Sequence, residues 1–332
     1  MKHFTSYLFL FTSCLLLLTS CEYKELCYDH NHWTHASVDY DWTRATGAQP
    51  KGMTLDIYNA AKPETDVIKY QAARTETGLY IFGNVAEGGI RLNPGTYQAV
   101  SYNYDTETIR YRGETASNFE AYTRVSSVEE GTKLTRSRMP RAVPEEDVIL
   151  EPDSLWAGAT DTIKMASVDS VYVMDIALEP RFAEVDITIT NVPNLQYTGQ
   201  YGAALSGLAS SIYMADGTLG EGTATIAFPC EKQGTSTLYA KFRMFGHCPH
   251  QDDGLTNTHL LTVYFILADG QKWYYTIDVS NQMHDKILNP DHLHIHLNLD
   301  GSTMPVPKPI VNGSGFKPTV DDWTGENIDV TM

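Results

Sequence analysis

Short stretches in which apolar and polar residues alternate recur along most of the chain, separated by Gly, Pro, Asn and Asp. In one of them Met53, Leu55 and Ile57 share a face, with Thr54 and Asp56 between them. A period of two residues is typical of β-strands that place one face on a core. Strands are therefore predicted at residues 37–42, 53–58, 79–82, 96–104, 108–111, 118–123, 171–178, 183–190, 211–214, 223–228, 236–245, 259–268, 272–279 and 292–299.

The signals between these stretches favour antiparallel pairing. Asp269-Gly270 separates two predicted strands and is a strong two-residue hairpin signal. Residues 280–288 suggest one short helix, with Ser280 as its N-cap. Many short antiparallel strands at this spacing build sandwiches or barrels. At about 150 residues per domain, the length of the chain suggests two domains. We therefore predict an all-β fold of two β-sandwich domains in tandem, with few short helices.

Prolines and charge runs mark the expected boundaries. Residues 124–160 carry three prolines and many charges, so a long loop is expected to connect the domains there. Prolines at 305, 307 and 309 predict an extended connector, because proline cannot donate to a strand ladder. The expected organisation is a signal peptide at 1–20, a lipidated tether at 21–35, an N-terminal sandwich at 36–160 that includes the 124–160 loop, and a C-terminal sandwich at 161–332 with a connector at 301–318 and a detached terminal strand at 319–332.

The first residues form a secretory signal. Lys2 supplies a positive charge, residues 4–18 are mainly apolar, and Ser20 directly precedes Cys21. A small residue before a cysteine is typical of signals that are cut ahead of a cysteine that then receives lipid. The apolar run is shorter than the roughly 20 residues of a transmembrane helix. We expect a bacterial lipoprotein held at the outer membrane or cell surface by acyl chains on Cys21; the alternative is an ordinary signal with a chance cysteine.

Charge and cysteine content narrow the possible partners. The net charge is −17, and so acidic a body repels phosphate backbones, so we expect no nucleic-acid partner. Besides Cys21, the mature chain keeps Cys27, Cys230 and Cys248, so at least one thiol has no partner within the chain. A Cys230–Cys248 disulfide stays open as a possibility, because the strand predicted at 236–245 would hold the two cysteines far apart unless it bends.

No catalytic motif is recognised in the chain. It lacks the His-Glu-x-x-His, Gly-x-Ser-x-Gly, dinucleotide-binding and P-loop patterns, so neither an enzyme activity nor a cofactor is expected. Tyr102 and Tyr104 are the candidate ligand-binding residues, because exposed tyrosines on a sandwich could stack on a sugar. The alternative is that they only pack in the core or across strands.

Two groups of residues have the types that bind metals but not the arrangement. His292, His294 and His296 lie on one face of a predicted strand, where three imidazoles rarely converge, so a solvent-exposed face is favoured. The second group comprises Cys27, His30, His32 and His35. Its spacing matches no structural zinc site, so we predict no metal in either group.

Several segments resemble an uncharacterised family of Bacteroidetes lipoproteins, a domain of unknown function. These segments are 21–32, 91–97, 102–105, 119–124, 205–209 and the tail from 320. The chain is more distantly similar to the fimbrillins, the subunits and anchors of surface fimbriae. That resemblance implies two fimbrillin-like β-sandwiches with Greek-key or transthyretin-like strand order, arrival as a lipoprotein, and assembly by strand donation.

The same resemblance implies a processing site. Fimbrillins mature through a trypsin-like cut after an arginine beyond the first strand, and Arg44 occupies a comparable place here. The alternative is that Arg44 is an ordinary loop arginine.

Two functions follow from these observations. The first is a non-catalytic fimbrial anchor, accessory or subunit protein in adhesion and assembly. Its partners would be fimbrillin-like subunits that bind by strand addition through the tail at 319–332. The second is a surface glycan- or ligand-binding lipoprotein that uses Tyr102 or Tyr104.

Overall fold

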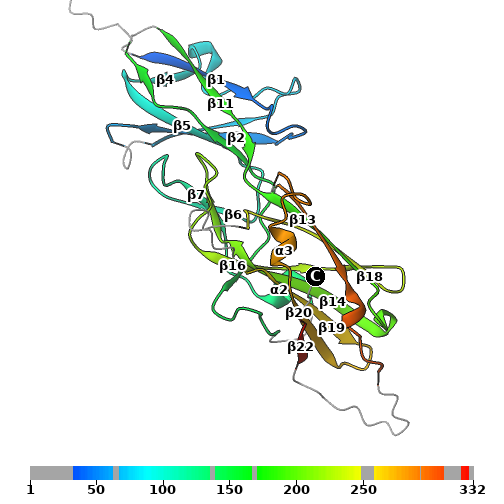
Figure 1. Cartoon of the computed structure of the whole chain (residues 1–332). Helices are drawn as coiled ribbons and strands as arrows, with labels where there is room; N and C mark the ends of the chain where they lie inside the picture. Colours follow the sequence, from blue (N-terminus) through cyan, green and yellow to red (C-terminus); the bar gives the residue numbers. More distant parts are fainter. Residues whose placement is uncertain are drawn as a thin grey trace, which may run out of the picture.

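The computed structural model describes residues 33–62, 67–134, 139–166, 170–247, 258–291, 293–309 and 323–328. Its regular elements are almost all β-strands, and the prediction of an all-β fold with few short helices is confirmed. Figure 1 shows an elongated molecule with one group of sheets at each end and a smaller sheet between them. Among the residues that the structure describes, no helix is long and apolar enough to span a membrane.

The first sandwich contains the earliest strands of the chain. A three-stranded sheet has the order β11-β1-β4, and a six-stranded sheet has the order β12-β9-β5-β2-β3, with β10 also paired to β5. Ala36 and Ile176 from the small sheet are buried in one cluster with Met53, Leu55 and Ile57 from the large one. The strand bounds are β1 Thr34–Asp41, β2 Gly52–Asn59, β3 Val67–Ala73, β4 Ile90–Leu92, β5 Gly95–Asn103, β9 Trp156–Ala159, β10 Ile163–Met165, β11 Val171–Ala177 and β12 Glu179–Pro180.

The second sandwich has a four-stranded sheet of order β17-β18-β13-β21 and a six-stranded sheet of order β22-β20-β19-β14-β16-β8. Val185 and Phe242 from the first sheet share a buried cluster with Leu205, Phe228 and Phe265 from the second. The strand bounds are β8 Asp147–Ile149, β13 Ala183–Thr190, β14 Thr198–Ala209, β16 Thr223–Pro229, β17 Glu231–Gln233, β18 Thr237–Met244, β19 Leu260–Leu267, β20 Lys272–Asp278, β21 His294–Asp300 and β22 Thr324–Ile328.

A small sheet of order β15-β7-β6 lies between the two sandwiches in Figure 1. Its strands are β6 Ile109–Arg112, β7 Glu120–Thr123 and β15 Ser211–Tyr213. Ala121 and Ile212 of this sheet are buried with Tyr58 and Val100 of the first sandwich and Phe245 of the second. Both sandwiches therefore pack against one shared cluster.

Four of the described strand pairs are parallel, which the antiparallel expectation did not include: β1 with β11, β13 with β21, β16 with β8, and β20 with β22. In the first pair His35 lies opposite Val171. Strand β11 therefore belongs to the first sandwich, so the division expected at residue 160 does not match the sheets. The tether expected at 21–35 also ends too late, because Thr34 and His35 are already in β1. Parallel partners are joined by long crossovers, so no local turn signal reveals them.

The segment 124–160 is not simply a connecting loop. It contains helix α2 (Val128–Thr132), and its strands β8 and β9 pair with different sandwiches. Val128, Met139 and Val148 are buried with Tyr264 on the outer face of the six-stranded sheet of the second sandwich. The prolines correctly indicated irregular backbone, but the apolar residues between them cover a sheet face that would otherwise be exposed.

The proline-rich connector and the tail also differ from expectation. Met304 and Val306 are fully buried in the core of the second sandwich. The start of the predicted connector therefore packs into that core and does not form an extended linker. Strand β22 is not detached, because it pairs with β20 at the edge of the sheet. Trp323, just before β22, packs edge-on against Tyr264 with ring centroids 5.5 Å apart. Residues 310–322 and 329–332 lie outside the described residues.

Local predictions at single elements met mixed outcomes. The β19–β20 hairpin is confirmed. Helix α3 covers only Ser280–Met283, with Val279 rather than Ser280 at its N-cap. Residues 79–82 form no strand beyond a single bridge at Tyr80, and Leu79 is exposed. In the described ranges, the remaining helices are 3-10 turns at Val85–Glu87, Leu195–Tyr197 and Gly301–Thr303.

Candidate functional site

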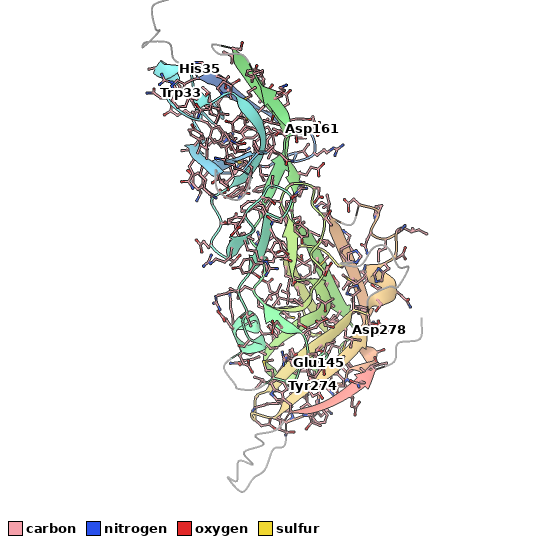
Figure 2. All side chains as sticks on the ribbon, turned by 90° about the vertical axis from the view of Figure 1, so that its left-hand side faces the viewer. Trp33, His35, Glu145, Asp161, Tyr274 and Asp278 are labelled. Carbon is pink, nitrogen blue, oxygen red and sulfur yellow. The ribbon has the colours of Figure 1, made fainter. Side chains whose placement is uncertain are left out.

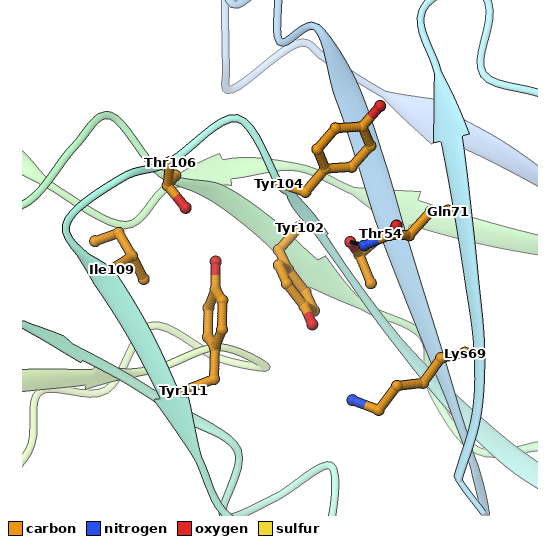
Figure 3. Close-up of a pocket in the computed structure, with 8 residues that line it drawn as sticks. All are labelled: Thr54, Lys69, Gln71, Tyr102, Tyr104, Thr106, Ile109 and Tyr111. Atoms are coloured by element: carbon orange, nitrogen blue, oxygen red, sulfur yellow. Dashed lines mark hydrogen bonds between the residues drawn. The ribbon is translucent and has the colours of Figure 1, made fainter.

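The two tyrosines expected to bind a ligand line one surface hollow of about 610 Å³ (Figure 3). Strand β5 carries Tyr102, and Tyr104 follows its end. The facing wall comes from β6 and the loop before it, and the third side comes from β2 and β3. The lining residues are Thr54, Lys69, Gln71, Tyr102, Tyr104, Thr106, Ile109 and Tyr111.

Tyr102 forms a wall of this hollow and does not project from it. It is buried, and its ring packs against Tyr111 and Phe119 with centroids 4.7 Å and 5.4 Å away. Its hydroxyl donates to Oδ2 of Asp56 at 3.3 Å. Burial, reinforced by the Asp56 carboxylate, raises the pKa of Tyr102 well above its usual range. Tyr102 is thus a neutral hydrogen-bonded core residue.

Tyr104 is the more accessible of the two tyrosines. Its side chain is 38% exposed, which leaves ring surface available to a ligand. The ring lies against the backbone of Gly52, where an added Cβ atom would come within 2.2 Å of three of its atoms. A larger residue at position 52 would force the ring to move. The backbone therefore supports the ring from one side and fixes its orientation.

A buried carboxylate lies beside the hollow. Asp56 on β2 is fully buried, and its Oδ2 accepts a hydrogen bond from Nζ of Lys69 at 2.7 Å. Its Oδ1 is buried and has no hydrogen-bond partner. The lining itself offers hydroxyls, one amide and one ammonium group, with no carboxylate among its members. Such a surface suits a neutral, hydroxyl-rich ligand better than acid–base chemistry.

Arg44 lies in the turn that follows β1, and its side chain is 73% exposed. Its guanidinium forms an ion pair with Glu179, which also pairs with Arg181 at 3.0 Å. The hydrogen bond to Arg44 is the main reason that the pKa of Glu179 lies below its usual value. Ala45, the next residue, is buried, and its N–H donates to the carbonyl of Trp42 at 3.0 Å. A protease would have to open this turn to reach the bond after Arg44.

Several predicted residues lie outside the described part of the chain. They are Cys21, Cys27, His30, His32, Cys248 and His292, so the structure tests neither lipidation nor the Cys230–Cys248 disulfide. Cys230 is inside the described part, and burial raises the pKa of its thiol to about 12.

The histidines of β21 have the solvent-exposed placement that was favoured. His294 contacts Asp291, with Nδ1 3.1 Å from a carboxylate oxygen, and His296 lies 3.8 Å from Asp186. Their side chains are 58% and 51% exposed. His35, from the other group, places Nδ1 3.2 Å from the carbonyl of Gly88.

A different histidine cluster was missed in the sequence. His247, His259 and His284 bring their ring nitrogens together in the second sandwich. No motif joins these positions, because each comes from a different element. The one signal in the sequence was His259, which lies at the boundary of a strongly apolar strand. A polar side chain in such a place is expected to be buried and to need a hydrogen-bond partner or ligand.

The fold is that of a two-sandwich β protein with a solved structural counterpart. It is similar to the crystal structure of a candidate adhesin from Bacteroides ovatus, with 20% sequence identity, a TM-score of 0.60, and coverage of 88% of this chain and 99% of that chain. The fimbrial anchor protein Mfa2 from Porphyromonas gingivalis matches with 9% identity and a TM-score of 0.49, over 80% of this chain and 90% of that one.

The chain belongs to the family DUF5119, a domain of unknown function, whose model matches residues 20–229. This match confirms the resemblance to an uncharacterised family. A candidate fimbrium anchoring subunit of Bacteroides ovatus, Fim4B, is 27% identical over 181 residues, which are 54% of this chain and 47% of the relative. The chain thus matches about half the length of that curated relative.

Proposed function

We propose that this protein is a non-catalytic fimbrial anchor or accessory protein, held at the outer surface of the cell by lipid on Cys21. The observation that carries the proposal is the similarity to Fim4B, a candidate fimbrium anchoring subunit. The signal that ends at Cys21 supplies the means of attachment. A body of packed β-sandwiches, with no catalytic motif in its sequence, suits a mechanical role at a surface.

The placement of the two ends supports an anchor. Figure 2 shows Trp33 and His35, at the start of the described chain, near one end of the molecule. Tyr274 on β20, which pairs with β22, lies near the opposite end. A protein tethered by its N-terminus would therefore present the β20–β22 edge away from the membrane.

That far edge offers a place for strand addition. Strand β22 is the outermost strand of its sheet, and four of its five residues are exposed. An open edge presents unpaired N–H and C=O groups that a partner strand can use. A partner could pair with the outer side of β22, or it could displace β22 and pair with β20.

Cells that lack the gene test the anchoring role directly. The proposal expects fimbriae to leave the cells and collect in the medium, and it expects wild-type protein to restore their retention. The Cys21→Ser variant should not restore it, although it should fold. Electron microscopy and quantitative blotting of cells and medium measure the outcome. Retention of fimbriae by the deletion strain would overturn the proposal.

The strand-addition part has its own test. Deletion of residues 319–332 should leave the body folded, with a lower melting temperature because β22 and Trp323 are lost, while abolishing capture of fimbrial subunits in a pull-down. A truncated protein that fails to fold would show that β22 is an integral strand. A folded truncated protein that still captures subunits would show that another surface binds them.

The hollow around Tyr104 favours a second candidate function, the binding of a neutral glycan. The half-exposed ring fixed against Gly52 provides a stacking surface, and the surrounding hydroxyls provide hydrogen bonds. Tyr104→Ala should abolish signals on a glycan array, while Tyr239→Ala in the second sandwich should not. An array with no signal for the wild-type protein would remove this candidate.

A further inference from the structure

Three histidines from separate elements meet in the second sandwich. His247 follows β18, His259 precedes β19, and His284 is the C-cap residue of α3. Each offers one ring nitrogen, and these three atoms all lie within 4.8 Å of one another. The ring centroids are 4.9 to 5.6 Å apart. His247 and His259 are buried, and His284 is partly exposed, so the cluster lies just below the surface.

The orientation of His259 defines which of its nitrogens faces the cluster. Its Nδ1 lies 3.2 Å from the carbonyl oxygen of Ser206. A carbonyl oxygen only accepts, so Nδ1 carries the proton and Nε2 of the neutral ring has a free lone pair. The side chain is fully buried, and Nε2 has no hydrogen-bond partner. Buried polar atoms are rarely left without a partner, so this nitrogen requires an explanation.

Backbone contacts hold the cluster in place. The N–H of His259 donates to Oγ of Ser280 at 2.8 Å, and the N–H of His284 donates to the Ser280 carbonyl at 3.0 Å. Behind the ring, Gly207 has a φ of +77°, and an added Cβ atom there would lie 2.9 Å from Nδ1 of His259. Glycine is thus the residue that this approach allows. Ser280 and Gly207 position the imidazoles without using their cluster-facing nitrogens.

The electrostatic setting keeps His259 uncharged. Its pKa is lowered to about 4, mainly by burial and also by the neighbouring His284, whereas the hydrogen bond to Ser206 and the charge of Asp278 act in the opposite direction. A neutral imidazole is the form that binds a metal ion. An imidazole whose far nitrogen donates to a carbonyl is the usual arrangement of a metal ligand, because that bond fixes the tautomer and the ring plane.

We propose that His247, His259 and His284 bind one divalent transition-metal ion, with zinc as the preferred ion. Three imidazoles suit zinc, copper or nickel, whereas calcium and magnesium require oxygen ligands. Zinc–nitrogen bonds of about 2.0–2.1 Å in a tetrahedron place the nitrogens roughly 3.3 Å apart, so modest side-chain rotations complete the site. The fourth position is left for water or an added ligand. The ion links the end of β18, the start of β19 and the end of α3.

The test uses the mature full-length chain, stripped with EDTA and titrated with zinc chloride by calorimetry. One zinc ion per chain should bind, and it should raise the melting temperature, whereas calcium chloride should do neither. Cobalt chloride should give visible absorption bands of a nitrogen-coordinated tetrahedral ion. His284→Gln should weaken zinc binding at least about 100-fold, because outer partners of a metal ligand alone contribute about 10- to 100-fold.

Two matched variants make the result specific. The double variant His294→Gln/His296→Gln removes exposed histidines of the same sandwich, and a triple variant with Cys27→Ser, His30→Gln and His32→Gln removes three of the four members of the N-terminal group. Both should bind zinc like the wild type. His284 is partly exposed, so His284→Gln should keep the far-ultraviolet circular dichroism and the metal-free melting temperature of the wild type.

Three results would overturn the proposal. The first is wild-type protein that binds no zinc at micromolar concentration. The second is zinc affinity that His284→Gln leaves unchanged. The third is binding that disappears in either matched variant, since the metal would then lie elsewhere.

Discussion

The ring of Tyr274 on β20 covers Gly325 on β22, where the two parallel strands pair. A Cβ atom on Gly325 would lie 2.0 Å from the Tyr274 ring. A larger residue at this position would have to displace the Tyr274 ring from the strand.

Gly325→Val should separate β22 from β20, because the added side chain and the Tyr274 ring cannot occupy the same space. We expect the amides of residues 324–328 to exchange with deuterium much faster, while the rest of the sandwich keeps its protection. Thr324→Val, at the neighbouring exposed position, is the control. Unchanged protection in the Gly325 variant would show that the ring moves aside without cost to the pairing.

His259 should make the stability of the metal-free protein depend on pH. Its pKa is about 4 in the folded chain and 6.5 as the reference value. Between these values the unfolded chain binds a proton that the folded chain does not, so stability falls as the pH falls. The expected loss is about 2 kcal/mol between roughly pH 7 and pH 5.

Urea unfolding of the wild type and of His259→Gln measures this loss. The variant should show a smaller decrease over the same range, because glutamine does not titrate. His247, His284 and Asp278 remain in both proteins, so the difference between the two curves isolates His259. Parallel curves would argue that this histidine is as solvated in the folded chain as in the unfolded one.

Arg181 should be far more important for stability than Arg44, although both pair with Glu179. Arg181 is buried and also donates to the carbonyls of Met214 and Ala215, each at 3.3 Å. Arg181→Met leaves these carbonyls without a donor and should cost about 2–4 kcal/mol. Arg44→Ala removes only an exposed pair and should leave the unfolding midpoint almost unchanged. Equal midpoints for the two variants would contradict the assigned burial.

The stacked pair Phe228 and Phe242 should be a major contact between the two sheets of the second sandwich. Their ring centroids are 4.1 Å apart with planes 8° from parallel, and both side chains are buried. Phe242→Ala should lower the free energy of unfolding by about 3–5 kcal/mol, because it leaves a cavity. Tyr239→Phe on the same strand removes one surface hydroxyl and should cost less than about 1.5 kcal/mol. Denaturant titration of both variants tests the contrast.

Strands with one buried face could be predicted from the sequence. In β13 and β21 every second side chain is buried, and the predicted bounds are within two residues of the observed ones. Strand β14 was missed, because Gly202, Ala203 and Ala204 lack the branched side chains that mark a strand and because both its faces are covered. Strand β3 was missed because its alternation is weak and most of its residues are partly or fully exposed.

The sequence named two of the eight residues that line the candidate hollow, but it did not distinguish their roles. The sequence placed Tyr102 and Tyr104 on one strand and its end, where period two gives both the same face. Only the contact of Tyr102 with Asp56, and of Tyr104 with Gly52, separates a buried wall residue from an exposed ring. Both contacts join residues about 50 positions apart, beyond the reach of a local pattern.

The sequence by itself determined the all-β class, the strand faces and the family resemblance, and it predicts the secretory signal that ends at Cys21, because each of these depends on neighbouring residues. The tertiary structure alone decided that β11 joins β1, that β22 is docked on β20, and that His247, His259 and His284 meet. Pairing between distant segments depends on which buried faces fit together, and that fit is a property of the packed molecule.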